Sequence, residues 1–455
     1  MQPITLSPEQ QALFDYIETS DNNIFVTGRA GTGKSTLLSY FIENTEKKVA
    51  VCAPTGVAAL NVGGVTIHSL FGFPFGVLGE VDLAKHLNRR SREVLAALDV
   101  LVIDEISMVN ADLMDAMSRA LGIARGRRKL PFGGAQVVMF GDPYQLAPVP
   151  GNAEERAYMA ENYQSSWFFD AHVWREDSLE RFELSEIFRQ HDEHFKDILN
   201  AIRDGSCTQE MLDHLNTCGN RFPPHDDVIR LATTNETVNS VNRNRMARIE
   251  SKPKTFEAIF TAEDERVFGR TLPADPVLEL KVGAQVMFIK NDDSSTIKNP
   301  NGGTLKRWVN GTIGHVKALP SSGGVIVEVD GEELEVGRST WEKVRYEIDE
   351  EFDEATGRVK EVLVAVPLAE FQQIPLRLAW AVTVHKSQGQ TYDEVVVDMG
   401  RGAFSPGQTY VALSRVRSLD GLYLTRAIRM NDVMVDQDVL RFMQGIKQPP
   451  AGKLF

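Results

Sequence analysis

Cysteine is scarce in this sequence, with only Cys52, Cys207 and Cys218 among 455 residues. They show no C-x-x-C spacing and cannot all pair with one another, so we expect no disulfide framework, no zinc site and a reducing compartment. The sequence has no run approaching the ~18 apolar residues of a membrane span. Its first residues also lack the basic and apolar regions of a secretory signal. These absences predict a soluble, cytoplasmic protein with no membrane partner.

Basic residues are outnumbered, because 49 Lys and Arg stand against 63 Asp and Glu, for a formal charge of −14. Taken alone, this balance argues against a nucleic-acid partner, whose affinity would come mainly from basic side chains. The acidity is uneven, however, since residues 328–361 hold 13 acidic and 5 basic side chains. Basic clusters elsewhere, such as the one containing Arg89 and Arg90, can still line a groove, so charge location outweighs total charge.

The hydrophobic pattern predicts α/β domains. Short apolar runs at 24–27, 49–53, 100–103 and 136–140 alternate with helical patterns, which is typical of buried parallel strands. A second such set begins near Val228 and resumes at 394–397, whereas β-branched alternation and a hairpin signal at Asp330-Gly331 dominate between them. We predict a first domain at 1–172, with a wedge insertion at about 72–92. The second domain consists of 173–280 and 370–445, and a small antiparallel β domain is inserted at 281–369. Residues 446–455 are expected to form a flexible tail.

The strongest motif is Gly28-Arg29-Ala30-Gly31-Thr32-Gly33-Lys34-Ser35, which satisfies G-x-x-x-x-G-K-[ST] between a strand and a helix. Its glycines let backbone N–H groups surround phosphates at a helix N-terminus. Lys34 is expected to reach the β- and γ-phosphates of ATP, and Ser35 to bind Mg²⁺. The sequence therefore predicts a nucleotide site.

Two further strand ends carry candidate catalytic residues. Asp104 and Glu105 follow the apolar run at 100–103, at the sheet edge where ligands of α/β proteins bind. Asp104 suits the Mg²⁺ shell, and Glu105 suits activation of the attacking water. Gln145 follows the run at 136–140 and could sense the γ-phosphate or orient water, although a surface loop is the alternative. Arg189 and Arg415 are candidate arginine fingers, with surface charges as the alternative.

The ordered motifs resemble superfamily-one DNA helicases, and most closely the PIF-type (petite integration frequency) family of the 5′-to-3′ branch, with RecD-like helicases as relatives. The matching segments run along nearly the whole chain. They are 6–10, the phosphate loop, Ala53-Pro54-Thr55-Gly56, 63–71, Asp104-Glu105, Pro131-Phe132-Gly133-Gly134, 378–389 with His385-Lys386-Ser387-Gln388-Gly389, and 410–415.

The resemblance implies two RecA-like domains with ATP in their cleft, Arg189 and Arg415 as fingers, and an inserted Src-homology-three-like barrel. It implies nucleotide contacts from Gln10, as the adenine reader, and from Gly28, Ala30, Gly31, Thr32, Gly33, Lys34, Ser35, Thr36 and Gly389. It also implies DNA contacts from Pro54, Thr55, Gly56, Thr66, His68, Ser69, Phe71, His385, Lys386 and Ser387.

These expectations combine into ATP-driven 5′-to-3′ translocation on single-stranded DNA with unwinding of forked or tailed duplex, by a monomer. The family implies work in DNA replication, repair and telomere maintenance. The alternative is a DNA-stimulated ATPase that displaces bound proteins without separating strands. For His68 and His385 the residues alone leave a structural imidazole open, and for Phe71, Phe73 and Phe75 they favour packing over base stacking. The tail is either disordered or a docking peptide for a replication or repair protein. The absence of a long leader favours a bacterial or phage protein and leaves nuclear or mitochondrial location open.

Overall fold

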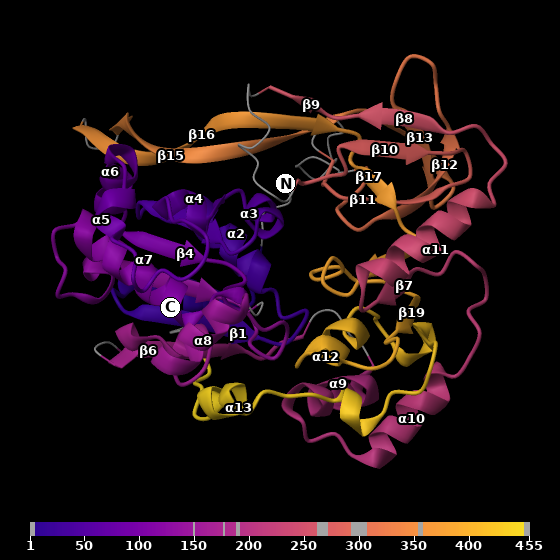
Figure 1. Cartoon of the computed structure of the whole chain (residues 1–455), viewed down its shortest axis with the longest axis horizontal. Coiled ribbons are helices and arrows are strands. Elements are labelled where there is room, and N and C mark those ends of the chain that lie inside the picture. The colour runs from indigo at the N-terminus through magenta and orange to yellow at the C-terminus, as the bar shows by residue number, and fades with distance from the viewer. Residues whose placement is uncertain are drawn as a thin grey trace.

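The computed structural model describes residues 5–148, 151–175, 178–187, 192–261, 272–292, 307–353 and 358–449. These residues form two parallel α/β domains with an antiparallel insertion, arranged as a first domain, a second domain and a β region above both (Figure 1). The α/β fold class with an antiparallel insertion predicted from the sequence is confirmed.

The first domain is built on a six-stranded parallel sheet of order β3-β2-β4-β5-β1-β6. Strands β1, β4 and β5 are buried along their whole length, which explains their continuous apolar runs. Alternate residues of β4 enter different cores, with Val102 facing α1 and α2 and Ile103 facing α7. The strands are β1 (Asn23–Gly28), β2 (Val49–Ala53), β3 (Val65–Thr66), β4 (Val100–Ile103), β5 (Gln136–Phe140) and β6 (Leu179–Leu184).

Eight helices of the described chain surround this sheet, and most begin at a side-chain cap such as Ser7, Thr55, Thr66, Asn88 or Asn110. The wedge insertion consists of α5 and α6, so its second helix extends beyond the expected end near residue 92. The helices are α1 (Pro8–Thr19), α2 (Lys34–Asn44), α3 (Gly56–Asn61), α4 (Ile67–Phe71), α5 (Leu83–His86), α6 (Arg89–Ala97), α7 (Ala111–Ala124) and α8 (Ala153–Asn162).

The second domain has a four-stranded parallel sheet of order β18-β7-β19-β20. Helices α9 and α12 share its apolar core with β7 and β19. Its elements are β7 (Arg230–Ala232), β18 (Ala381–Thr383), β19 (Val395–Asp398), β20 (Leu422–Leu424), α9 (Glu193–Asp204), α10 (Gln209–Gly219), α11 (Asn235–Ala247) and α12 (Gln408–Leu413).

The insertion contains a five-stranded antiparallel sheet of order β14-β13-β12-β11-β17, a β10-β8 pair and a long hairpin of β15 and β16 extended by β9. Asp330 and Gly331 both have positive φ, so the turn signal between β13 and β14 is confirmed. The strands are β8 (Lys254–Glu257), β9 (Ile259–Phe260), β10 (Val277–Leu280), β11 (Gln285–Phe288), β12 (Ile313–Ala318), β13 (Val325–Val329), β14 (Glu332–Val336), β15 (Ser339–Asp353), β16 (Arg358–Gln373) and β17 (Leu376–Leu378).

The domain boundaries differ from the sequence expectation in three places. Strand β6 pairs with β1, so residues 179–184 belong to the first domain rather than to the second. The insertion begins at β8 and ends at β17, wider than 281–369, because the flanking strands complete its core. Most acidic side chains of residues 328–361 are exposed, and the β15–β16 hairpin that carries part of this stretch lies across α3, α4 and α6 of the first domain (Figure 1).

The C-terminal segment returns to the first domain, where α13 (Gln437–Met443) packs beneath the sheet (Figure 1). Phe442 stacks on Phe169 with ring centroids 4.2 Å apart. Lys447 then pairs with the β6 edge, donating its N–H to the Arg181 carbonyl at 3.1 Å. The edge strand β6 has backbone groups that no further strand of the sheet pairs with, and Lys447 bonds to them. The first residues of the expected tail, 446–449, are therefore ordered on this edge. Residues 450–455 lie outside the described residues.

Candidate nucleotide cleft and nucleic-acid interface

The phosphate loop joins β1 to α2 at the carboxyl edge of the first sheet. Gly31 and Gly33 adopt φ of 87° and 77°, a left-handed conformation that a Cβ atom would strain. The ammonium group of Lys34 donates to the Gly28 carbonyl at 2.6 Å and to the Arg29 carbonyl at 3.2 Å. Its charge is thus held within the loop, where it can meet an anionic ligand.

Gln10 lies directly against this loop at the start of α1. Its Nε2 donates to the carbonyls of Thr32 and Gly33 at 3.3 Å each, and its Oε1 accepts from the Ser7 N–H at 3.0 Å. The side chain is therefore fixed at the rim of the cleft by a capping box on one side and the phosphate loop on the other. An adenine base at this rim would meet a preset amide.

Asp104 and Glu105 follow β4, and Glu105 adopts φ of 50°, which is rare for a residue with a side chain. Burial raises the pKa of Asp104 and of Glu105, and the neighbouring Asp104 charge raises that of Glu105 further. Lys34 opposes both effects electrostatically. Strain and a perturbed pKa at one buried carboxyl group are typical of a functional position.

Gln145 lies across the cleft from the phosphate loop and is held by two partners. Its Nε2 donates to the Asp142 carboxylate at 3.3 Å. Its Oε1 accepts from Gln388 of the second domain at 3.2 Å, and the same Gln388 amide donates to Glu105 at 3.0 Å. Gln388 therefore links both candidate catalytic residues of the first domain to the second domain.

Arg415 reaches the cleft from the end of α12, where its side chain is almost fully buried. Its guanidinium donates to the carbonyls of Val411 at 2.9 Å and Gln390 at 3.3 Å, and to the Ser414 hydroxyl at 2.8 Å. These acceptors fix the orientation of the guanidinium, which lines the cleft. Arg189 lies outside the described residues.

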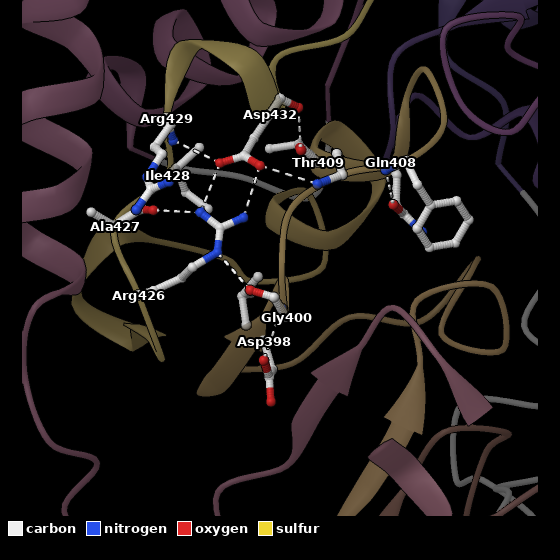
Figure 2. A network of polar contacts seen from close by, with 12 residues as sticks. Asp398, Gly400, Gln408, Thr409, Arg426, Ala427, Ile428, Arg429 and Asp432 are labelled. Carbon is white, nitrogen blue, oxygen red and sulfur yellow. Dashed lines mark hydrogen bonds and ion pairs between the residues drawn. The ribbon is translucent and has the colours of Figure 1, made fainter. Parts of the chain in front are cut away.

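A buried ion pair anchors the start of α12 (Figure 2). Arg426 donates two hydrogen bonds to the Asp432 carboxylate, both at 2.8 Å, and the Thr409 hydroxyl donates to the Asp432 carbonyl at 2.6 Å. Burial alone would raise the pKa of Asp432, but hydrogen bonds from Arg426 and from two backbone N–H groups lower it. The carboxylate stays ionised and fixes the helix that precedes Arg415.

The cleft between the two domains encloses about 940 Å³. Twelve of the predicted nucleotide and catalytic residues line it: Gln10, Ala30, Gly31, Thr32, Gly33, Lys34, Ser35, Thr36, Glu105, Gln145, Gly389 and Arg415. Gly28 and Asp104 are not among the lining residues. The structure adds eight lining residues that the predicted site set omitted: Thr5, Leu6, Ser7, Pro8, Glu186, Gln388, Thr391 and Arg417. Gln388 adjoins Gly389 in the quoted motif, and only its contacts assign it a role.

The expected Mg²⁺ ligands have suitable chemistry. Ser35 supplies a hydroxyl in the cleft, and Asp104 supplies a carboxyl group whose pKa is raised by burial against the opposing effects of the Glu105 backbone N–H and the Lys34 charge. Hard oxygen donors of this kind, completed by phosphate and water, suit Mg²⁺. The residues present therefore fit the ion.

The DNA contacts expected in the first domain fall on α3, α4 and the loops before them. The Thr55 hydroxyl accepts from the Ala58 N–H and the Thr66 hydroxyl from the Ser69 N–H, both at 3.2 Å, so each caps a helix. Pro54, Gly56 and His68 are half-buried and Ser69 is exposed. Burial lowers the pKa of His68, which favours a neutral imidazole.

The phenylalanines beside these helices divide into core and surface. Phe71 and Phe73 are buried and stack on each other with ring centroids 5.0 Å apart, so the Phe71 ring is covered by the core, and its contact with DNA stays a prediction. Phe75 is 80% exposed and stacks on His68 with ring centroids 4.8 Å apart. The alternate spacing in the sequence could not distinguish the buried Phe71 and Phe73 from the exposed Phe75, because the loop turns after Phe73.

The second-domain candidates lie in the turns after β18. His385 and Lys386 are exposed, and partial burial lowers the pKa of each. Ser387 is fully buried and its hydroxyl donates to the Val384 carbonyl at 2.8 Å. Its side chain therefore closes the turn, and its contact with DNA stays a prediction.

The basic cluster of the wedge insertion, which contains Arg89 and Arg90 of α6, lies next to the acidic β15–β16 hairpin. Arg90 pairs with Glu347 of β15 at 3.4 Å, whereas the neighbouring Arg89 pairs with Glu93 of its own helix. Tyr346 enters the first-domain core beside the wedge, and its hydroxyl accepts from the Val51 N–H at 2.9 Å. The sequence prediction did not anticipate this contact.

The two parallel α/β domains and their shared phosphate-loop cleft define the class: a two-domain P-loop protein of the RecA type. A family model described as PIF1-like helicase matches residues 5–213. The ATP-dependent DNA helicase Pif1 of Bdellovibrio bacteriovorus is 32% identical over 96% of this chain and 92% of its own length. The chain belongs to the PIF1-like helicase family, as the motifs predicted. It spans 65% of the longer PIF1 helicase from Emericella nidulans, which is also 32% identical to it.

Solved structures agree with this family. The Pif1 of Bacteroides sp in complex with ADP-AlF4 is 34% identical and matches with a TM-score of 0.84, covering 96% of each chain. The Bacteroides Pif1 bound to single-stranded DNA is 35% identical over the same share of each chain, but its TM-score is 0.66. No helix in the described ranges is long and apolar enough to cross a bilayer.

Proposed function

We propose that this protein is an ATP-dependent DNA helicase that translocates 5′-to-3′ on single-stranded DNA and unwinds forked or tailed duplex. One observation carries the proposal: a single cleft is lined by the phosphate loop of one domain and by Gln388 and Arg415 of the other. ATP binding and hydrolysis in a cleft shared by two domains can close and reopen that cleft. Such a change in the relative position of the domains is what movement along a DNA strand requires. The relatives named as DNA helicases supply the substrate class.

The chain's own residues divide the chemistry of hydrolysis. Lys34 binds the β- and γ-phosphates, and Gln10 reads the adenine. Glu105 accepts the proton of the attacking water, which Gln145 orients. Arg415 and Arg189 stabilise charge on the γ-phosphate, an effect of about 10³- to 10⁵-fold in related phosphoryl transfers. Ser35 and Asp104 would hold Mg²⁺, which when bound neutralises phosphate charge.

The nucleic-acid path would cross both domains. In this proposal the strand contacts the helix-capping segments at 54–56 and 66–69 of the first domain and His385 and Lys386 of the second, whose side chains are exposed. Backbone amides at helix starts, hydroxyls and a few cations suit a sequence-independent grip on a strand. The crystal structure of a Bacteroides relative bound to single-stranded DNA supports this substrate.

Strand displacement tests the proposal. Duplexes with a 5′ tail, a 3′ tail or no tail are incubated with protein and ATP, while phosphate release is measured with and without single-stranded DNA. We expect DNA-stimulated hydrolysis and displacement of the 5′-tailed duplex alone. Hydrolysis without displacement would favour a remodelling ATPase, and displacement of the 3′-tailed duplex would refute the direction.

A further inference from the structure

One arginine of the second domain is buried against the first domain beside the cleft, yet lines no part of it. Arg203 lies near the end of α9, whose apolar residues belong to the second-domain core, and its side chain is 6% exposed. Its guanidinium donates to Asp142 at 3.1 Å and to Glu183 at 3.0 Å. It also lies over the Tyr144 ring at 4.3 Å. All three partners belong to the first domain.

Asp142 is shared between this arginine and the candidate γ-phosphate sensor. One carboxylate oxygen, Oδ1, accepts from Arg203, while the other, Oδ2, accepts from the Gln145 side chain at 3.3 Å. The Tyr144 N–H also donates to Oδ1 at 3.2 Å, which fixes the carboxylate plane. The position of the Gln145 amide is thus tied to a cation carried by the opposite domain.

Residues of the second domain constrain both polar atoms of the Gln145 side-chain amide. Gln388 donates to the Gln145 Oε1, and Arg203 acts on its Nε2 through Asp142. Close backbone packing supports the same seam, because a Cβ atom on Gly407 would lie 1.7 Å from the Gln145 carbonyl oxygen. If the domains separated, a buried carboxylate would lose its ion pair and Gln145 would lose both constraints.

We propose that Arg203 is a positioning residue that couples closure of the two domains to the orientation of Gln145 for hydrolysis. It touches neither substrate nor the reacting water and acts through Asp142. The inference rests on the proposed function, because it assigns Gln145 to the γ-phosphate or the attacking water. It adds a residue of the second domain to the control of that step.

The main test is steady-state hydrolysis by Arg203→Gln at saturating single-stranded DNA. We expect kcat to fall about 10- to 100-fold while KM for ATP changes less than about threefold, because a misplaced Gln145 would weaken a contact that stabilises the transition state. Arg203→Lys should recover part of kcat, since an ammonium can meet Asp142 but cannot also contact Glu183 and stack on Tyr144. An unchanged kcat in Arg203→Gln would overturn the proposal.

Glu183→Gln is the matched control. It removes the other carboxylate of Arg203 and leaves the link from Asp142 to Gln145 intact. We expect its melting temperature to fall about as much as that of Arg203→Gln while its kcat stays within about twofold of the wild-type value. An equal loss of kcat in both variants would mean that Arg203 is only a structural tether, which also overturns the proposal.

A double-mutant cycle separates coupling from an independent role. If Arg203 acts through Gln145, the double variant Gln145→Ala/Arg203→Gln should have the kcat of Gln145→Ala alone. Losses that multiply would contradict the proposal. Should Arg203→Gln fold poorly, Asp142→Asn/Arg203→Gln removes the unpaired buried carboxylate and should show the same low kcat. Wild-type protein without DNA-stimulated hydrolysis would refute the proposed function itself, and that measurement comes first.

Discussion

The first domain meets distant parts of the chain at two places that are built differently. At the nucleotide cleft, Arg203, Gln388 and Tyr410 of the second domain make buried polar contacts, including a 3.0 Å bond from the Ala30 N–H to the Tyr410 hydroxyl. At the hairpin, the contact combines the buried Tyr346 and partly buried apolar side chains such as Val344 with ion pairs that water reaches, such as Arg90–Glu347 with side chains 51% and 30% exposed.

This difference sets how each contact responds to loss. A buried charge left without its partner costs about 3–5 kcal/mol, so the cleft tolerates little change in the groups that pair across it. Exposed ion pairs contribute about 0–1 kcal/mol and weaken with salt. The cleft is therefore a specific joint on which chemistry depends, whereas the exposed ion pairs at the hairpin can be lost at small cost.

The largest effect is expected at the phosphate loop. Lys34→Ala should lower ATP turnover by at least about 10³-fold, because no other group of the loop carries its charge to the phosphates. Arg415→Ala should have an effect of the same order. Binding of single-stranded DNA, followed by fluorescence anisotropy, should persist in both. Near-normal hydrolysis in either variant would remove the residue from the catalytic set.

Glu105→Gln should affect activity and stability in opposite directions. Hydrolysis should fall about 10²- to 10⁴-fold, because the general base is lost. The pKa of Glu105 is raised in the folded state, so the folded protein binds this proton more tightly than the unfolded chain does. The contribution of Glu105 to stability therefore falls as pH rises through that raised pKa.

The melting temperature of Glu105→Gln should accordingly exceed that of the wild type by about 2–4 °C at pH 8. At pH 5, where the buried carboxyl group is already protonated, the two should nearly coincide. Thermal unfolding followed by circular dichroism checks this. A stability difference that did not change with pH would contradict the raised pKa.

At the hairpin, Tyr346→Phe should have a smaller effect. The variant keeps the ring in the core but loses the hydroxyl that accepts from the Val51 N–H, at a cost of about 0.5–1.5 kcal/mol. Faster hydrogen exchange at the Val51 amide would report the loss, with kcat for ATP hydrolysis staying within about twofold. A change in kcat as large as that at the cleft would remove the contrast between the two contacts.

The exposed pair Arg90–Glu347 should contribute least to folding. A double-mutant cycle with Arg90→Glu and Glu347→Arg should give a coupling free energy below about 1 kcal/mol that declines with added salt. Arg90→Glu should also weaken binding to forked DNA at low salt if the wedge meets phosphate. Unchanged affinity would restrict Arg90 to the hairpin contact.

Much of the site could be predicted from the sequence, because its chemistry depends on local motifs. A phosphate loop needs glycines at fixed spacing next to Lys34, and a buried parallel strand needs a continuous apolar run, so the order of motifs predicted the cleft. Gln388 and Arg203 could not be assigned roles in this way. Their roles come from partners more than 50 residues away in sequence, as the contacts Gln388–Glu105 and Arg203–Asp142 show.

Periodicity and short motifs are encoded within one strand, turn and helix, so the α/β class, the family and the residues of the phosphate loop can be predicted from the sequence. The packing of β6, the acidic hairpin and the C-terminal segment cannot be predicted in this way. Edge pairing and burial against another domain depend on surfaces that segments distant in the chain form together. The negative charge that first argued against DNA lies, in part, on a hairpin held against the first domain.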